Sequence, residues 1–244
     1  METSPLTSNA LTSTRLGSGQ MFDRIADRYD FVNRVLSLGL DLRWRRLATR
    51  ALALAPDVEG EVLDLATGTG DLALTIATLH PKVSVLGTDP SSNMLAVGQK
   101  KVADRHLSER VRLITGDAQA VDAADDRFLG ATIAFGIRNV PDRAKALAEM
   151  TRVVRSGGRV AVLELGEPNV GILGPFARFH VRHVVPRIGA LLSGQTEYRY
   201  LQTSIAAFPS ADAFADMMRA AGLEDVTYTP LTLGACTLYV GVKP

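Results

Sequence analysis

Apolar side chains in the N-terminal part of the chain recur at intervals of three and four residues, which is the spacing of one helix face. This pattern predicts a helix that begins near Met21 and ends near Gly39. Its apolar face comprises Phe22, Ile25, Tyr29, Val32 and Leu36. A second helix is predicted over 42–54, where leucines alternate with arginines. We expect residues 21–55 to form a helical cover over the domain that follows.

Beyond Pro56, short apolar runs alternate with stretches of helical periodicity. The runs predict strands at 61–66, 83–89, 111–117, 131–136, 159–165, 225–230 and 236–243. The stretches predict helices at 71–79, 91–104, 142–155 and 211–221. Such alternation is typical of an α/β fold with a doubly wound, mostly parallel sheet. The link between the last two runs is too short for a parallel crossover, so we expect an antiparallel C-terminal strand.

Composition limits the partners and the cellular compartment that we expect for this domain. The 244 residues carry a net charge of +1, which gives no general reason to expect a nucleic-acid partner. Cys236 is the only cysteine, as suits a reducing, cytoplasmic compartment. No apolar run approaches the roughly 18 residues of a membrane span. Residues 1–20, rich in Ser and Thr, are expected to be a flexible tail, and 21–244 a single domain.

The stretch VLDLATGTGD is a strand that runs into a glycine-rich turn and then a helix. Gly68 and Gly70 permit backbone dihedrals closed to other residues, and they let a ligand approach beyond the carboxyl ends of the strands. With Ala73, their spacing also fits a nicotinamide dinucleotide site. Asp64 in the strand and Asp71 at the helix start favour instead a ligand with a cationic amino acid end. S-adenosylmethionine is such a ligand.

Acidic residues end the next two predicted strands. Asp89 ends the second, where a carboxylate can accept both hydroxyls of a ribose. Asp117, followed by Ala118, ends the third, and its side chain could accept from an adenine amino group. We therefore predict a methyl-donor site at this edge of the sheet. The other candidate contacts are Ala66 and Thr69 at the glycine turn, Pro90 and Met94 after the second predicted strand, and Ala134 in the fourth.

Five blocks of the chain together resemble the ubiquinone/menaquinone biosynthesis C-methyltransferases, the UbiE/MenG family. They are MFDRIADRYDFVNRVLSLGLDLRWRR (21–46), VLDLATGTGDLA (62–73), AFGIRNV (134–140), RVVRSGGRVAVLELGEP (152–168) and YRYLQTSIAAFP (198–209). The glycine loop is shared by many methyltransferases. The YDFVN, FGIRNV and YRYL segments are far more specific.

The resemblance implies a class I S-adenosylmethionine-dependent methyltransferase, which has a Rossmann-like fold. It also implies methylation of a ring carbon of a polyprenylated quinol, such as demethylmenaquinol to menaquinol or a benzoquinol of the ubiquinone pathway. In the family, the positions of Thr69, Asp89, Asp117 and Ala118 bind the methyl donor. The chain departs from the family pattern at Ala134, at 121–123 and at 166–168, which bears on the substrate contacts.

Arg138 and Asn139 follow the fourth predicted strand, at the edge where the glycine loop opens. A ring carbon becomes a good nucleophile when the adjacent hydroxyl loses its proton. We therefore predict that Arg138 stabilises the phenolate or polarises a water that takes the proton. Asn139 would orient the hydroxyl or that water, and Tyr29 would donate a further bond. The alternatives are a structural ion pair between Arg138 and Glu164, and plain core packing of Tyr29.

Residues 168–196 interrupt the strand–helix alternation and contain no Asp or Glu. This basic, apolar segment predicts a helical insertion that contacts an anionic membrane surface peripherally or forms a lid over an isoprenoid tail. Packing on the domain, or on a second copy in a homodimer, is the alternative. His180 and His183 have no evident third ligand, so no metal site is expected.

Three other functions stay open at this point. The chain could methylate oxygen or nitrogen of another small molecule, it could be a nicotinamide oxidoreductase, or it could be a non-catalytic binding protein on a methyltransferase fold.

Overall fold

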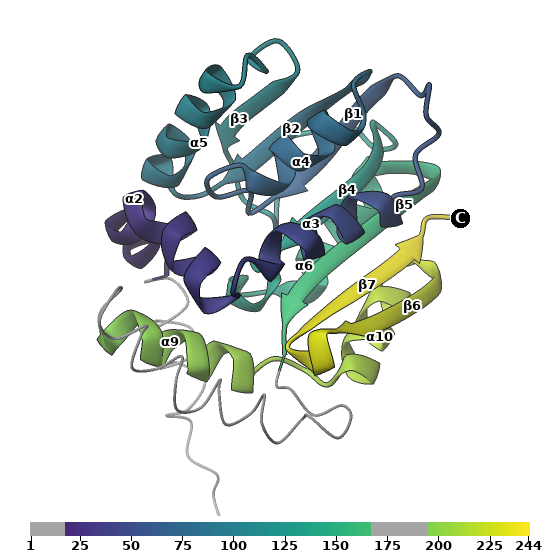
Figure 1. The fold of residues 1–244 in the computed structure, drawn as a ribbon. Coiled ribbons are helices and arrows are strands. Elements are labelled where there is room, and N and C mark those ends of the chain that lie inside the picture. The colour runs from purple at the N-terminus through teal and green to yellow at the C-terminus, as the bar shows by residue number, and fades with distance from the viewer. Residues whose placement is uncertain (1–17, 167–194) are drawn as a thin grey trace, which may run out of the picture.

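A seven-stranded sheet forms the centre of the computed structural model, which describes residues 18–166 and 195–244 (Figure 1). Its strand order is β3-β2-β1-β4-β5-β7-β6, and only β7 runs antiparallel to its neighbours. The strands are β1 (Gly60–Leu65), β2 (Val83–Asp89), β3 (Val111–Thr115), β4 (Phe128–Ala134), β5 (Val154–Leu165), β6 (Glu224–Leu231) and β7 (Cys236–Val242). The prediction of a mostly parallel sheet with an antiparallel C-terminal strand is confirmed.

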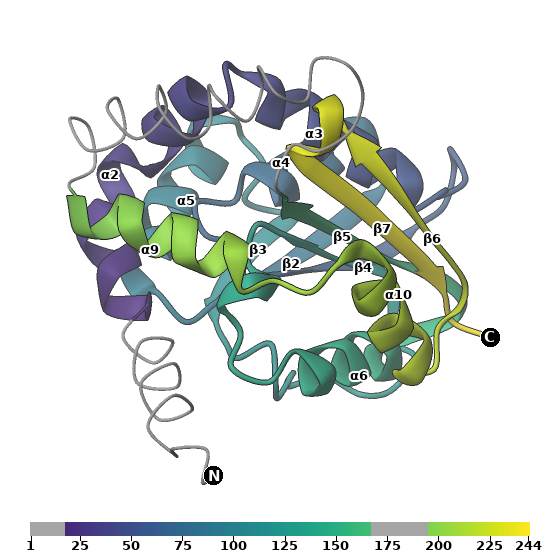
Figure 2. The ribbon, with the colours of Figure 1, turned by 90° about the horizontal axis from the view of Figure 1, so that it is seen from below.

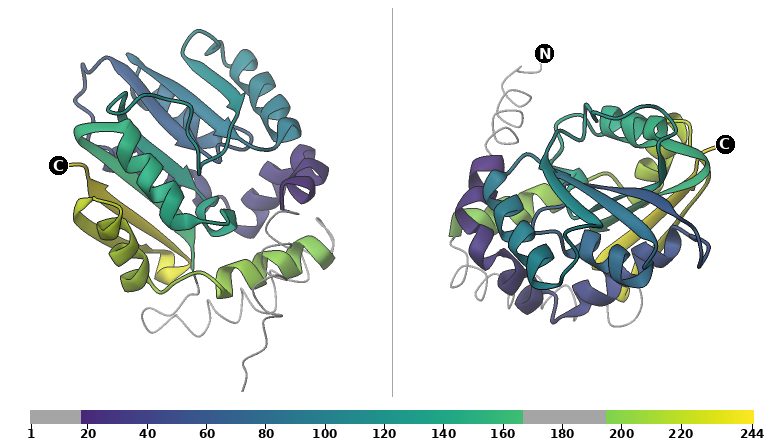
Figure 3. Two further views of the ribbon diagram at one scale, coloured as in Figure 1. Left: turned by 180° about the vertical axis from the view of Figure 1, so that it is seen from behind. Right: turned by 90° about the horizontal axis from the view of Figure 1, so that it is seen from above.

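Helices cover both faces of the sheet (Figures 1 and 3). One face carries α3 (Leu40–Ala51), α4 (Asp71–Leu79) and α5 (Ser92–Asp104), and the other carries α6 (Arg143–Val153) and α10 (Ala211–Ala220). Each layer encloses its own apolar core, centred on Leu74 and Ile76 on one face and on Phe214 and Met218 on the other. Burial on both faces explains why the central strands are continuous apolar runs.

Two further helices, α2 (Ser18–Leu36) and α9 (Gln195–Ala206), lie at the end of the sheet where the parallel strands terminate (Figures 1 and 2). Helix α2 contacts α5, and α9 contacts the short 3₁₀ turn η1 (Ile137–Asn139). Among the described residues, no helix has the length and apolarity needed to cross a membrane.

Most predicted elements agree with the structure within a few residues, and α4 and β2 agree at both ends. Helix α9 was not predicted. Helix α2 begins at Ser18, inside the expected tail. Strand β3 ends two residues before Asp117, and β4 ends at Ala134 because Phe135 adopts a left-handed conformation (φ 59°). The predicted insertion, with His180 and His183, lies almost entirely outside the described residues.

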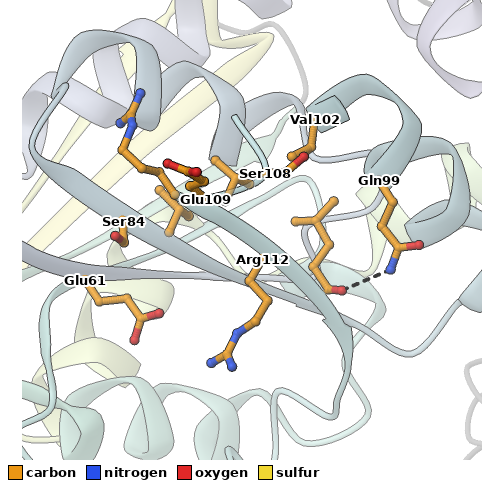
Figure 4. A pocket seen from close by; sticks show the side chains of 11 residues that line it. Glu61, Ser84, Gln99, Val102, Ser108, Glu109 and Arg112 are labelled. Carbon is orange, nitrogen blue, oxygen red and sulfur yellow. Dashed lines mark hydrogen bonds between the residues drawn. The ribbon is translucent and has the colours of Figure 1, made fainter. Parts of the chain in front are cut away.

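The sheet reverses its winding direction between β1 and β4, whose registers pair Leu65 with Ile133. In open α/β sheets, ligands bind beyond the carboxyl ends of the strands at such a switch point. A shallow pocket of about 390 Å³ lies instead near the amino ends of β1, β2 and β3 (Figure 4). Its lining includes Glu61, Ser84 and Arg112 and none of the candidate site residues, so it is separate from the predicted donor site.

Candidate active site

The turn between β1 and α4 has the backbone conformation that its glycines predict. Gly68 (φ 56°) and Gly70 (φ 76°) are both left-handed, and Ala66 before them is left-handed as well (φ 48°). Because a non-glycine residue rarely adopts this conformation, Ala66 marks a strained turn of the kind found at ligand sites. A Cβ atom at Gly68 would lie 3.3 Å from Met94 Cε, so the turn packs closely on the start of α5.

The Asp89 carboxylate joins this turn to the next one. It accepts from the backbone N–H of Gly68 (2.9 Å) and from that of Ser91 (2.9 Å). Burial is the largest influence on the pKa of Asp89 and raises it, while the two backbone donors oppose the shift. The carboxylate retains lone pairs for hydroxyl donors of a ligand. The predicted position of Asp89 beside the glycine turn is therefore observed.

Asp64 lies beneath the turn and is 1% exposed. Its carboxylate accepts from the hydroxyls of Thr67 (2.6 Å) and Thr132 (2.8 Å). Burial raises its pKa to about 6, although the two hydroxyls act in the opposite direction. Asp64 thus joins β1 to β4 and to the glycine turn through these hydrogen bonds. The sequence alone did not reveal this structural role.

Helix α2 is bonded to the glycine turn through Asp30. The Thr69 hydroxyl donates to Asp30 across 2.6 Å, and Lys101 of α5 donates to the same carboxylate across 2.7 Å. Lys101 also forms an ion pair with Asp71 at the start of α4. Burial by itself would raise the pKa of Asp71, but the charges of Lys101 and Arg45 outweigh it and lower the pKa.

A second bond ties α2 to the start of α5, where Asp23 accepts from the Ser91 hydroxyl across 2.5 Å. Our sequence reasoning missed Asp23, Asp30 and Lys101. The two aspartates are seven residues apart and share one helix face, a spacing that could have pointed to a common contact. Lys101 gave no such signal, because its partners are distant in sequence.

The other candidates lie around the same edge. Asp117 is exposed and accepts from the backbone N–H of Gln119 (2.8 Å), and Ala118 is half-buried against the core. Ala134 ends β4 and is half-buried. Pro90 lies between Asp89 and Ser91 in the β2–α5 turn and is exposed.

The segment after β4 touches the glycine turn directly. A Cβ atom at Gly136 would lie 2.5 Å from the Ala66 side chain, so only glycine fits this contact. Phe135 is buried, and Arg45 of α3 lies over its ring, 5.1 Å from the centroid. These contacts place η1, and with it Arg138 and Asn139, next to the candidate donor site.

Arg138 is 5% exposed and forms an ion pair with Glu164 at the end of β5, with 2.6 Å between Nη1 and Oε1. The same Nη1 donates to the Phe135 carbonyl (2.6 Å), and the backbone N–H of Arg138 donates to Glu164 Oε2 (3.1 Å). Burial would lower the pKa of Arg138, but Glu164 outweighs it and raises the pKa. The ion pair considered as an alternative from the sequence is therefore present.

The remaining edge of the guanidinium faces a different environment. Arg138 Nε is buried and makes no hydrogen bond within the described part of the chain. The phenol groups of Tyr29 and Tyr200 lie within electrostatic range of Arg138. Tyr29 is half-buried, and burial raises its pKa while the Arg138 charge opposes the shift. Tyr200 donates to Asn139 Oδ1 across 3.0 Å and was not identified from the sequence.

This arrangement fits S-adenosylmethionine better than a dinucleotide. Asp89 and the backbone at Gly68 suit either ligand, because both carry a ribose, so the start of α4 is the feature that discriminates between them. The start of α4 is occupied by Asp71, whose lowered pKa keeps it ionised. A pyrophosphate that binds at a helix N-terminus needs a free positive end, whereas this helix start already carries the Asp71 carboxylate, which is ion-paired with Lys101 and Arg34.

Comparison with known proteins decides the family. The ubiE/COQ5 methyltransferase family matches residues 9–243, nearly the whole chain. The chain belongs to this family. It is a methyltransferase that uses S-adenosylmethionine.

Relatives of this methyltransferase match over almost their full lengths. The ubiquinone/menaquinone biosynthesis C-methyltransferase UbiE of Geotalea daltonii is 44% identical over 225 residues, covering 92% of this chain and 95% of the relative. The demethylmenaquinone methyltransferase of Thermus thermophilus is 46% identical over 226 residues, covering 92% and 100%. A solved SAM-dependent methyltransferase of Thermotoga maritima matches with a TM-score of 0.62 at 21% identity, covering 92% of this chain and 99% of that one. At that identity, the solved structure supports the fold alone.

Proposed function

We propose that this methyltransferase transfers a methyl group from S-adenosylmethionine to a ring carbon of a polyprenylated quinol, as in demethylmenaquinol to menaquinol. A benzoquinol of the ubiquinone pathway fits the same chemistry. The observation that carries the proposal is the position of the Arg138–Glu164 pair, flanked by Tyr29 and Asn139, beside the glycine turn. The names of the relatives at 44% and 46% identity support it independently.

When bound, S-adenosylmethionine supplies an electrophilic methyl group on a sulfonium. The residues that would hold it are Gly68, Thr69, Asp89, Asp117 and Ala118. Their combined chemistry is suited to a diol, an amino group and a positive charge. The remaining candidates, Asp64, Ala66, Gly70, Pro90, Met94 and Ala134, shape the turns around it.

The chain's contribution to carbon methylation is to favour the phenolate form of the quinol. The ring hydroxyl would lose its proton to water, and the ring carbon would then accept the methyl group that S-adenosylmethionine supplies, with the bonding electron pair left on the donor. The methylated ring carbon would afterwards lose its own proton. Donors fixed beside the phenolate oxygen lower the barrier, because they stabilise charge that develops there.

Arg138 is suited to donate rather than to accept a proton, because a guanidinium stays protonated. Glu164 neutralises much of its charge and fixes its orientation. The contribution of Arg138 therefore comes from N–H donors of fixed geometry, and Arg138 Nε is the candidate donor to the phenolate oxygen. Asn139 would orient the ring hydroxyl or a water beside it, and Tyr29 would contribute a further hydrogen bond from α2.

We also propose that the protein takes its lipid substrate from a membrane surface. Three large apolar side chains are exposed close together in sequence, at the end of α2 and the start of α3: Phe31 (59%), Leu38 (72%) and Leu42 (41%). Exposed arginines of α3 follow them, Arg43, Arg46 and Arg50. Apolar side chains beside cationic ones suit the interface of an anionic bilayer. A cytoplasmic location and a homodimer stay predictions.

The function is tested by incubating the protein with methyl-labelled S-adenosylmethionine and demethylated naphthoquinol or benzoquinol of equal tail length. We expect a singly methylated product whose fragmentation places the label on a ring carbon. A label on oxygen or nitrogen would replace the proposal by another methyltransferase activity. Tight binding of the methyl donor without turnover of any quinol would favour a non-catalytic binding protein.

A further inference from the structure

Helix α9 brings a second phenol to the candidate site. The Tyr200 hydroxyl donates to Asn139 Oδ1 across 3.0 Å, and both side chains are half-buried. Within the described residues, Asn139 Nδ2 makes no hydrogen bond, so the acceptor end of this amide is held and its donor end is available. Asn139 follows Arg138 in η1, and the Tyr200 hydroxyl that bonds the Asn139 amide also lies within electrostatic range of Arg138, the residue proposed to face the phenolate.

We propose that Tyr200 is a positioning residue, whose hydroxyl fixes the Asn139 amide so that Nδ2 donates to the ring oxygen of the substrate. This inference rests on the proposed quinol methylation. The physical reason is that a side-chain amide is nearly symmetric in shape but opposite in chemistry at its two ends. Rotated by half a turn, Asn139 would present a carbonyl oxygen to a developing phenolate and oppose its formation. Because the Tyr200 hydroxyl donates to Oδ1, the rotated orientation of the amide is disfavoured.

The anchoring of α9 supports this role. Phe208, just after α9, packs against Phe214 of the core in a tilted arrangement with ring centroids 4.9 Å apart. Arg143 lies over the same Phe208 ring at 5.4 Å and donates to the Arg138 carbonyl across 3.2 Å. The end of α9 and the η1 turn are thus joined through Arg143. Tyr200 is therefore presented to Asn139 by a helix that is fixed to the segment it orients.

A double-mutant cycle on turnover tests the inference, because it asks whether Tyr200 acts through Asn139. The variants are Tyr200→Phe, Asn139→Ala and their combination, measured at saturating methyl donor. Losing a donor to a developing anion costs about 100-fold in kcat, so we expect that loss for Asn139→Ala. We expect about a 10-fold loss for Tyr200→Phe, because one neutral hydrogen bond orients the amide. The combined variant should be no slower than Asn139→Ala.

Tyr228→Phe is the matched control. Tyr228 lies on the distant strand β6, and the substitution removes a hydroxyl that donates to Asp212 across 2.6 Å. It should leave kcat unchanged, and none of the variants should alter the affinity for S-adenosylmethionine. Asn139→Asp is a second variant that does not depend on the folding of Tyr200→Phe. Its carboxylate still accepts from Tyr200 but has no N–H, so we expect the same loss as for Asn139→Ala.

Each other outcome overturns the inference. Wild-type turnover in Tyr200→Phe would mean that the hydroxyl positions nothing. Losses that multiply in the combined variant would mean that Tyr200 acts independently of Asn139. Near-normal turnover of Asn139→Asp would mean that no donor is needed there. If the wild-type protein methylates no quinol carbon, the proposed function itself fails, and that result is seen before any variant is compared.

Discussion

The Arg138 guanidinium and the Glu164 carboxylate form a buried ion pair across 2.6 Å, with Arg138 5% and Glu164 1% exposed. Glu164 also accepts from the backbone N–H groups of Arg138 (3.1 Å) and Leu165 (2.8 Å). One carboxylate thus joins the end of β5 to the η1 turn that follows β4. The pair is both a brace of the sheet edge and the support of the proposed chemical centre.

These two roles separate when one or both partners are replaced. Arg138→Met leaves a buried carboxylate unpaired, so we expect the free energy of unfolding to fall by about 3–5 kcal/mol. Adding Glu164→Gln removes that charge and should recover most of the stability. Turnover should stay at least about 100-fold below wild type in both variants, because the donor to the phenolate is absent. Urea unfolding and quinol turnover measure the two effects. Recovery of turnover together with stability would make Arg138 a structural residue only.

The stability of the protein should carry a pH signature of Asp64. Its pKa is raised from 3.8 to about 6 in the folded protein, so the folded state binds the proton more tightly than the unfolded state. Asp64 therefore costs stability as pH rises through 4 to 6, by about 3 kcal/mol once it is fully ionised. Asp64→Asn removes this cost, so its stability relative to wild type should rise between pH 4 and pH 7. Denaturant unfolding without ligand at both pH values tests this, and a pH-independent difference would contradict it.

Asp89 should control the affinity for the methyl donor. Asp89→Asn retains the shape of the side chain but replaces one of two acceptor oxygens with a donor, so the ribose hydroxyls and the backbone N–H groups of Gly68 and Ser91 can no longer all be satisfied. Hydrogen bonds to charged groups are worth about 1.5–3 kcal/mol, so we expect a 10- to 100-fold weaker Kd for S-adenosylmethionine by calorimetry. Asp104→Asn, at an exposed helix end, is the matched control. Equal affinity in both variants would remove Asp89 from the site.

Contact with a membrane should depend on the exposed apolar side chains of the α2–α3 region. Replacing Phe31 and Leu38 by Ser removes apolar area that a bilayer would bury, so binding to vesicles with anionic headgroups should fall by at least about 10-fold. Binding of the wild type should also weaken with salt, because the α3 arginines are screened. Leu79→Ser, another exposed leucine, is the control. Unchanged co-sedimentation of the double variant would end this part of the proposal.

Much of the fold could be predicted because its signals are local. The apolar periodicity of 71–79 and 83–89 located α4 and β2, and the glycines of the turn between β1 and α4 predicted its left-handed residues. Helix α9 escaped prediction because its polar and apolar residues alternate irregularly beside a segment interpreted as an insertion. Asp117 was placed at a strand end, although β3 stops at Thr115.

The candidate site was predicted in outline but not in its connections. Glu164 was named as an alternative partner of Arg138, and that pair is present. The Thr69–Asp30–Lys101 cluster joins residues 39 and 71 positions apart in the chain. The local pattern around Thr69 and around Lys101 does not indicate such a partner, because long-range polar contacts depend on how the elements pack.

The sequence by itself determined the order of the elements, the glycine turn and the acids that follow the strands, since each depends on dihedral preference or on apolar spacing within a few residues. Only the tertiary structure decided that α2 lies against the glycine turn, that Arg138 is paired, and that Tyr200 reaches Asn139. These contacts are set by the packing of helices on a sheet edge, where each polar side chain that leaves water must find a partner from another segment.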